Sequence, residues 1–89
     1  MSRPITPDLK RQSKTYRQAL GAVVTRLRTG KNLSQRVFAA KTGYSVGYMN
    51  QIESGKRNLS LEMIQALAEV FGLRASQLLA KAERKHAKR

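Results

Sequence analysis

Three short apolar stretches of this chain each lie between a serine and a glycine. The bounding residues are Ser34 and Gly43, Ser45 and Gly55, and Ser60 and Gly72. A serine side chain accepts a backbone N–H at the start of a helix, and glycine readily takes the left-handed conformation that ends one. Because apolar residues inside these stretches recur at helical spacing, we predict three short helices, over 35–42, 45–54 and 60–72.

A longer helix precedes these three. Its apolar face and its end are marked by Leu20, Val24, Leu27 and Gly30. The segment Thr6-Pro7-Asp8 also has the residues of a helix start, namely a cap, a proline and an acid. The residues from Lys10 to Lys14 are polar and basic, however. Residues 1–15 are therefore either a basic arm or an extension of the first helix.

A fifth helix is marked by Leu78, Leu79 and Ala82. No alternation of β-branched residues predicts a strand, and 89 residues leave no room for a second domain. We therefore expect an all-α protein with one compact five-helix domain over residues 16–80. The last nine residues, 81–89, are rich in cations, and we expect them to form a fraying, solvated basic tail.

The connection between the second and third helices consists of Gly43 and Tyr44 alone. Two short helices joined by so short a turn must cross at a steep angle, which is the geometry of a helix-turn-helix.

The charge indicates a polyanionic partner. Lysine and arginine number 18 against 5 acidic residues, which gives a formal net charge of +13. Clustered cations displace condensed counterions from nucleic acid, and this release supplies affinity without sequence preference.

Enzyme chemistry lacks the necessary residues. The chain has no cysteine, and its one histidine, His86, lies in the basic tail, so we expect no metal site, no cofactor and no catalytic residue. The apolar runs are much shorter than a membrane-spanning helix requires. We therefore expect a soluble cytoplasmic protein that does not bind membranes.

The outer face of the third helix has unusually small and amide-bearing side chains. With Met49 and Ile52 turned to the core, the outward positions are Val46, Gly47, Asn50, Gln51 and Ser54. Asparagine and glutamine can bond adenine with two hydrogen bonds, and valine suits a thymine methyl group. The cations and amide of Lys56, Arg57 and Asn58 follow, where phosphates would lie. A solvated helix followed by an ordinary turn is the alternative.

From Leu20 to Leu79 the sequence resembles the Cro/C1-type helix-turn-helix family, also called the XRE family. The resemblance is carried by "LGAVVTRLRTGKNLSQ", "FAAKTG", "SVGYMNQIESGKRNLS" and "IQALAEVFGL". It implies a lambda-repressor-like fold of five helices, with the helix-turn-helix formed by the second and third helices. It further implies a prokaryotic or phage-type transcriptional regulator that binds double-stranded DNA, with the third helix in the major groove.

The resemblance also assigns residues to roles. Base-facing positions are Val46, Gly47, Asn50 and Gln51, and phosphate-facing positions are Gln35, Arg36, Ser45, Tyr48, Lys56, Arg57 and Asn58. Arg28 and Glu53 correspond to an ion pair that locks the reading helix to the first helix. Relatives bind inverted repeats as homodimers, and Phe71, Leu73, Leu78 and Leu79 could share a dimer surface with the core.

The chain departs from the family pattern at three places. Val46 stands where many relatives have a glutamine that bonds the one at Gln35, so Gln35 loses that partner. Leu59 replaces a common proline, and "RNLSL" instead resembles controller proteins of restriction-modification systems. Arg74 replaces the usual serine or aspartate cap, so we expect a ragged start to the fifth helix.

Two other functions fit the same features. An antitoxin or similar interaction module retains a helix-turn-helix and would purify with an acidic protein partner. A non-specific, nucleoid-type or RNA-binding basic protein would bind random duplexes or structured RNA as well as any single DNA site.

Overall fold

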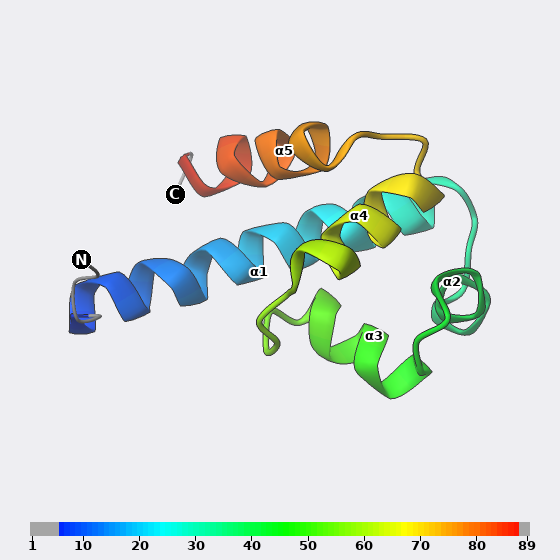
Figure 1. Ribbon diagram of the computed structural model, residues 1–89, viewed down its shortest axis with the longest axis horizontal. Helices are drawn as coiled ribbons and strands as arrows, with labels where there is room; N and C mark the ends of the chain where they lie inside the picture. The colour runs from blue at the N-terminus through cyan, green and yellow to red at the C-terminus, as the bar shows by residue number, and fades with distance from the viewer. Residues whose placement is uncertain (1–5, 88–89) are drawn as a thin grey trace.

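The structure, a computed structural model, describes residues 6–87, and these residues form five helices and no strand (Figure 1). The helices are α1 (Pro7–Gly30), α2 (Gln35–Thr42), α3 (Val46–Glu53), α4 (Leu61–Val70) and α5 (Ala75–Ala87). The expected all-α, five-helix fold is confirmed. None of the helices in the described part of the chain has the length and apolar character required to cross a membrane.

The serine and glycine pattern sets the bounds of the three short helices. The side chains of Ser34, Ser45 and Ser60 accept the backbone N–H groups of Val37, Tyr48 and Met63 at 3.1, 3.1 and 3.2 Å. Gly43, Gly55 and Gly72 all have positive φ, at 81°, 75° and 67°. Local capping chemistry therefore determines where α2, α3 and α4 begin and end.

Helix α1 begins at Pro7, so residues 7–15 extend the first helix. The hydroxyl of Thr6 accepts the N–H of Leu9 at 3.2 Å, and Pro7 occupies the first helical position. Residues 1–5 of the alternative basic arm lie outside the described part of the chain.

Five helices enclose one apolar core, and α1 lies in the middle of the molecule. Helices α5 and α3 pack on opposite sides of α1, above and below it in Figure 1. Val23 and Val24 of α1, Phe38 of α2 and Leu67 of α4 are fully buried. The Phe38 and Phe71 rings stack with their centroids 5.2 Å apart, which joins α2 to the end of α4.

Helix α5 is longer than the sequence suggests. We expected a fraying tail from Lys81, whereas the helix continues to Ala87. Ala82 is fully buried, and the His86 ring lies 2.9 Å from the Thr15 hydroxyl of α1. These contacts with the extended α1 hold the last turns of α5 in place.

The start of α5 is capped despite the arginine at the cap position. The side-chain oxygen of Gln77 accepts the backbone N–H of Arg74 at 2.8 Å, and the Arg74 carbonyl accepts the N–H of Leu78 at 3.1 Å. A glutamine three residues into the helix thus supplies half of a capping box. The expected ragged start is not observed, because this partner lies inside the helix.

Burial raises the pKa of the Tyr16 phenol, and the nearby Glu83 carboxylate raises it further. Tyr16 lies on α1 and Glu83 on α5, and the phenol donates a long hydrogen bond of 3.5 Å to the Leu79 carbonyl of α5.

Candidate nucleic-acid interface

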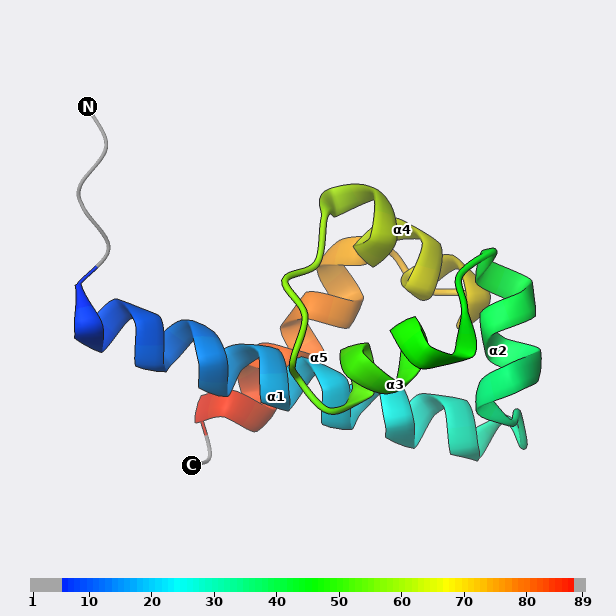
Figure 2. The ribbon, with the colours of Figure 1, turned by 90° about the horizontal axis from the view of Figure 1, so that it is seen from below.

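Helices α2 and α3 form the predicted helix-turn-helix. The turn between them is closed by Gly43 and Tyr44, whose N–H groups both bond the Ala39 carbonyl, at 2.9 and 3.2 Å. Figure 2, viewed from below, shows α3 at the front of the molecule and α2 crossing its end. Helix α3 is therefore on the surface, supported from behind by α1.

The four expected base-reading residues lie together on the exposed side of α3. Val46, Gly47, Asn50 and Gln51 are all exposed, while Met49 and Ile52 are buried. A Cβ atom added at Gly47 would meet no other part of the described chain within 4 Å. This face can therefore approach a flat or grooved surface closely.

A cluster of polar and aromatic side chains borders this face along the length of α3, from Tyr44 before the helix to Arg57 after it. The Arg57 Nε donates to the Gln51 side-chain oxygen at 2.5 Å, and its guanidinium lies 4.7 Å from the centre of the Tyr48 ring. The Tyr48 ring in turn stacks on Tyr44 at 5.4 Å. Arg57 therefore orients Gln51, and Gln51 must share or exchange this partner to bond a base edge.

The residues expected to contact phosphates divide into two groups. Arg36, Ser45, Lys56, Arg57 and Asn58 are exposed, whereas Gln35 and Tyr48 are half-buried. The Gln35 side-chain amide donates to Glu53 at 2.9 Å, so this amide is held against the scaffold.

An ion pair between Arg28 and Glu53 joins α1 to the end of α3. The two side chains bond at 2.6 and 3.1 Å, and they are only 13% and 7% exposed. Arg28 also donates to the Leu33 carbonyl at 2.6 Å. With Gln35 on the same carboxylate, this network joins α1, the start of α2 and α3. It fixes the orientation of the exposed helix face.

Two glycines bring the end of α3 directly against the backbone of α1. A Cβ atom on Gly21 would lie 2.5 Å from the Glu53 carbonyl oxygen, and one on Gly55 would lie 2.7 Å from the Gln18 backbone. Gly21 was not among the site residues expected from the sequence. Its signal was a glycine inside the apolar run "ALGAVV", where an ordinary core residue would be expected.

Arg17 is a second residue that was not expected from the sequence. Its guanidinium donates to the Asn58 side-chain oxygen at 3.0 Å, which connects α1 to the expected phosphate-binding turn. Its Nε is buried without a partner among the described residues. Local patterns in the sequence do not indicate this contact, because it joins residues far apart in the chain.

The expected dimer surface is smaller than its four residues suggest. Leu78 is fully buried and Phe71 is 7% exposed, so both belong to the core. Leu73 and Leu79 are half-buried and are the two that retain area for a partner. Amphipathic spacing alone does not separate a core-facing leucine from a partner-facing one.

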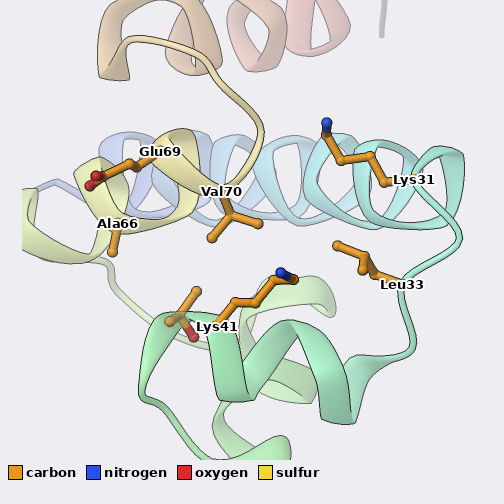
Figure 3. Close-up of a pocket in the computed structure, with 7 residues that line it drawn as sticks. Lys31, Leu33, Lys41, Ala66, Glu69 and Val70 are labelled. Atoms are coloured by element: carbon orange, nitrogen blue, oxygen red, sulfur yellow. The ribbon is translucent and has the colours of Figure 1, made fainter.

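A pocket of about 590 Å³ lies away from α3, among the end of α1, α2 and α4 (Figure 3). Figure 3 shows Lys31 and Leu33 on one side of the pocket and Glu69 on the other, with Val70 between them and Lys41 below. None of the expected site residues lines it. Among residues 6–87 there is also no group of three histidine, aspartate or glutamate side chains placed to hold a metal.

Similar proteins are regulators. The chain is 40% identical over 58 residues to the propionyl-CoA carboxylase regulator of Cereibacter sphaeroides, a match that covers 65% of this chain and 13% of that protein. It is 32% identical over 63 residues to the HTH-type transcriptional regulator y4dJ of Sinorhizobium fredii, covering 71% of this chain and 82% of the relative. This chain thus spans a small part of the first relative and most of the second.

The solved structures that resemble this chain are also those of regulators. The clp gene regulator ClgR of Corynebacterium glutamicum superposes with a TM-score of 0.76 at 28% identity, over 81% of this chain and 77% of ClgR. The restriction-modification controller protein C.AhdI of Aeromonas hydrophila superposes with a TM-score of 0.66 at 34% identity, over 70% of this chain and 94% of C.AhdI. A family model described as "Helix-turn-helix" matches residues 24–78. The chain therefore belongs to the Cro/C1-type, or XRE, helix-turn-helix family of DNA-binding transcriptional regulators.

Proposed function

We propose that this protein is a sequence-specific regulator that binds an inverted-repeat operator as a homodimer, with α3 in the major groove. The observation that supports this proposal is the exposed face of α3. It combines small and amide-bearing side chains with a rigid attachment to α1 through Gly21 and the Arg28–Glu53 pair. A helix that approaches base edges must be both unobstructed and fixed in orientation.

Each residue has a role in this proposal. Asn50 and Gln51 bond base edges, Val46 contacts a thymine methyl group, and Gly47 allows close approach. Exposed cations and hydrogen-bonding groups at the ends of α2 and α3 contact phosphates; they are Arg36, Ser45, Lys56, Arg57 and Asn58. Gln35 and Tyr48 contribute from half-buried positions.

The homodimer follows from the size of the recognition surface. One short helix reads about four base pairs, which is too little to specify one site in a genome, so two copies must bind half-sites about 34 Å apart. Leu73 and Leu79 provide apolar surface for this contact. The protein would act in the cytoplasm, at the DNA of a bacterium or its phage.

The test is selection of bound duplexes from a random library, followed by affinity measurements on two variants. A palindromic product would give the half-site, the spacing and the dimer symmetry together. Asn50→Ala should lower affinity for the selected site by about 1–3 kcal/mol and relax the preference at one position.

Lys56→Ala should weaken binding to all duplexes alike and reduce the slope of log affinity against log salt by about 1. Lys56 is the better phosphate variant, because Arg57 also holds Gln51 and its removal would disturb a base reader. Equal losses on every duplex from both variants would contradict the assignment of readers, and a library without a preferred sequence would contradict specific binding.

A further inference from the structure

Four cations surround a small hollow between α1 and α5. Arg26 of α1 and Lys81, Arg84 and Lys85 of α5 line a cavity of about 200 Å³. No carboxylate lines this cavity, and none of the four cations forms an ion pair within the described part of the chain.

This cluster carries an electrostatic cost. Lys81 lies three and four residues before Arg84 and Lys85, so the three side chains share one face of α5, and like charges at this spacing repel each other. Cations in the last turn of a helix are favoured by the helix dipole, and this accounts for Arg84 and Lys85. It does not account for Lys81, which lies earlier in the helix, or for Arg26, which comes from another helix.

The hollow is separate from the proposed DNA interface. Its residues lie on α5 and on α1, and α5 and α3 are on opposite sides of α1 in Figure 1. A duplex bound along α3 therefore leaves the four cations of the hollow without an anionic partner. The inference does not rest on the proposed function.

We propose that the hollow binds a dense phosphate group, of the kind carried by a pyrophosphate-bearing small molecule. Its volume is below the roughly 300–1,000 Å³ of pockets for larger organic ligands, so it suits an anionic group more than a whole nucleotide. The guanidinium groups of Arg26 and Arg84 can each bond two phosphate oxygens, and the two lysines add point charges. A bound anion would remove the repulsion between the two helices.

The experiment titrates the full chain with pyrophosphate at constant ionic strength and follows binding by calorimetry and thermal unfolding. The pocket variant is Arg26→Gln with Lys81→Gln. The matched control is Lys10→Gln with Lys14→Gln, which removes the same charge from exposed positions of α1 outside the hollow. If the pocket variant does not fold, Arg84→Gln with Lys85→Gln replaces it, because both side chains are exposed.

Pyrophosphate should raise the unfolding temperature of the wild type and the control, and the pocket variant should bind it about tenfold or more weakly. The proposal is overturned if sodium chloride of the same ionic strength raises the unfolding temperature as much as pyrophosphate does, or if the pocket and control variants lose affinity for pyrophosphate equally. A random duplex serves as a second probe. If the pocket variant loses affinity for both the duplex and pyrophosphate, the phosphate that binds the hollow belongs to nucleic acid. If it loses affinity for pyrophosphate alone, the phosphate belongs to a small molecule. Both results support the site.

Discussion

Gly21 shows how one missing side chain places the proposed reading helix. The backbone of α3 approaches α1 so closely at this position that an added Cβ would lie 2.5 and 2.6 Å from the carbonyl oxygens of Glu53 and Ile52. Real Cβ atoms do not approach backbone oxygens this closely, and neither backbone can move without shifting a helix. The absence of a side chain at Gly21 therefore sets the position of α3.

The first prediction concerns Gly21→Ala. Alanine favours a helix by about 1 kcal/mol over glycine, but the clash with α3 should cost more, for a net loss of about 1–3 kcal/mol in the free energy of unfolding. Urea unfolding measures this change. Gly30→Ala is the matched control, because nothing lies within 4 Å of the added atom and α1 should become slightly more stable. Equal stability of the two variants would show that α3 moves freely away from α1.

The second prediction concerns the buried carboxylate. Glu53→Ala leaves Arg28 and Gln35 without their shared acceptor in a site where the Arg28 side chain is only 13% exposed. We expect a loss of about 2–4 kcal/mol in unfolding free energy, measured by chemical denaturation. Glu69→Ala on the exposed side of α4 is the control and should change stability by less than about 0.5 kcal/mol.

A double variant separates the contribution of the Arg28–Glu53 ion pair from the cost of leaving one charge buried alone. Arg28→Met combined with Glu53→Ala removes both charges and should lose less than the two single variants together, because no charge is left buried alone. Simple additivity would mean that the ion pair does not couple α1 to α3.

At the scale of helices, the parts that could be predicted depend on neighbours in sequence. Caps at Ser34, Ser45 and Ser60 lie three residues from the N–H groups they accept, so α2, α3 and α4 could be placed from the sequence. The outward face of α3 followed from the helical spacing of its two core-facing residues, Met49 and Ile52. These features need no knowledge of the rest of the fold.

Whether the first turns of α1 and the last turns of α5 are helical could not be settled from the sequence, because each of these segments depends on the other. The first turns of α1 are polar, and the last turns of α5 are basic, so neither has a strong apolar signal. In the structure Thr15 and Tyr16 contact His86, with ring centroids of Tyr16 and His86 5.4 Å apart. Thr15 and His86, which share a hydrogen bond, are 71 residues apart in the sequence. Hydrophobic periodicity cannot detect a contact over this separation.

The third prediction tests whether the end of α5 is packed. Ala82→Gln places a long polar side chain in a fully buried position and should cost about 2 kcal/mol or more. Ala87→Gln makes the same change at an exposed position of the same helix and should be nearly neutral. Thermal unfolding by circular dichroism measures both. Equal losses of stability from the two variants would indicate that the last turns of α5 fray, as expected from the basic sequence of residues 81–89.

At the scale of the whole molecule, one charge excess acts on two equilibria in opposite directions. A formal net charge of +13 on 89 residues makes the folded chain repel itself, and the same charge attracts nucleic acid. Salt screens both interactions, with a Debye length of about 10 Å at 0.1 M. Added salt should therefore stabilise the fold while it weakens duplex binding.

The fourth prediction is that sodium chloride raises the unfolding temperature and lowers duplex affinity over the same concentration range. Scanning calorimetry measures the first effect and fluorescence anisotropy with a labelled duplex measures the second. Lys10→Glu with Lys14→Glu reduces the excess charge at exposed positions and should make the rise in unfolding temperature shallower. Both trends must appear together if the same excess charge acts on folding and on duplex binding. If the unfolding temperature stayed constant or fell with salt, self-repulsion would not limit the stability of this domain, and its many cations would be compensated within the fold.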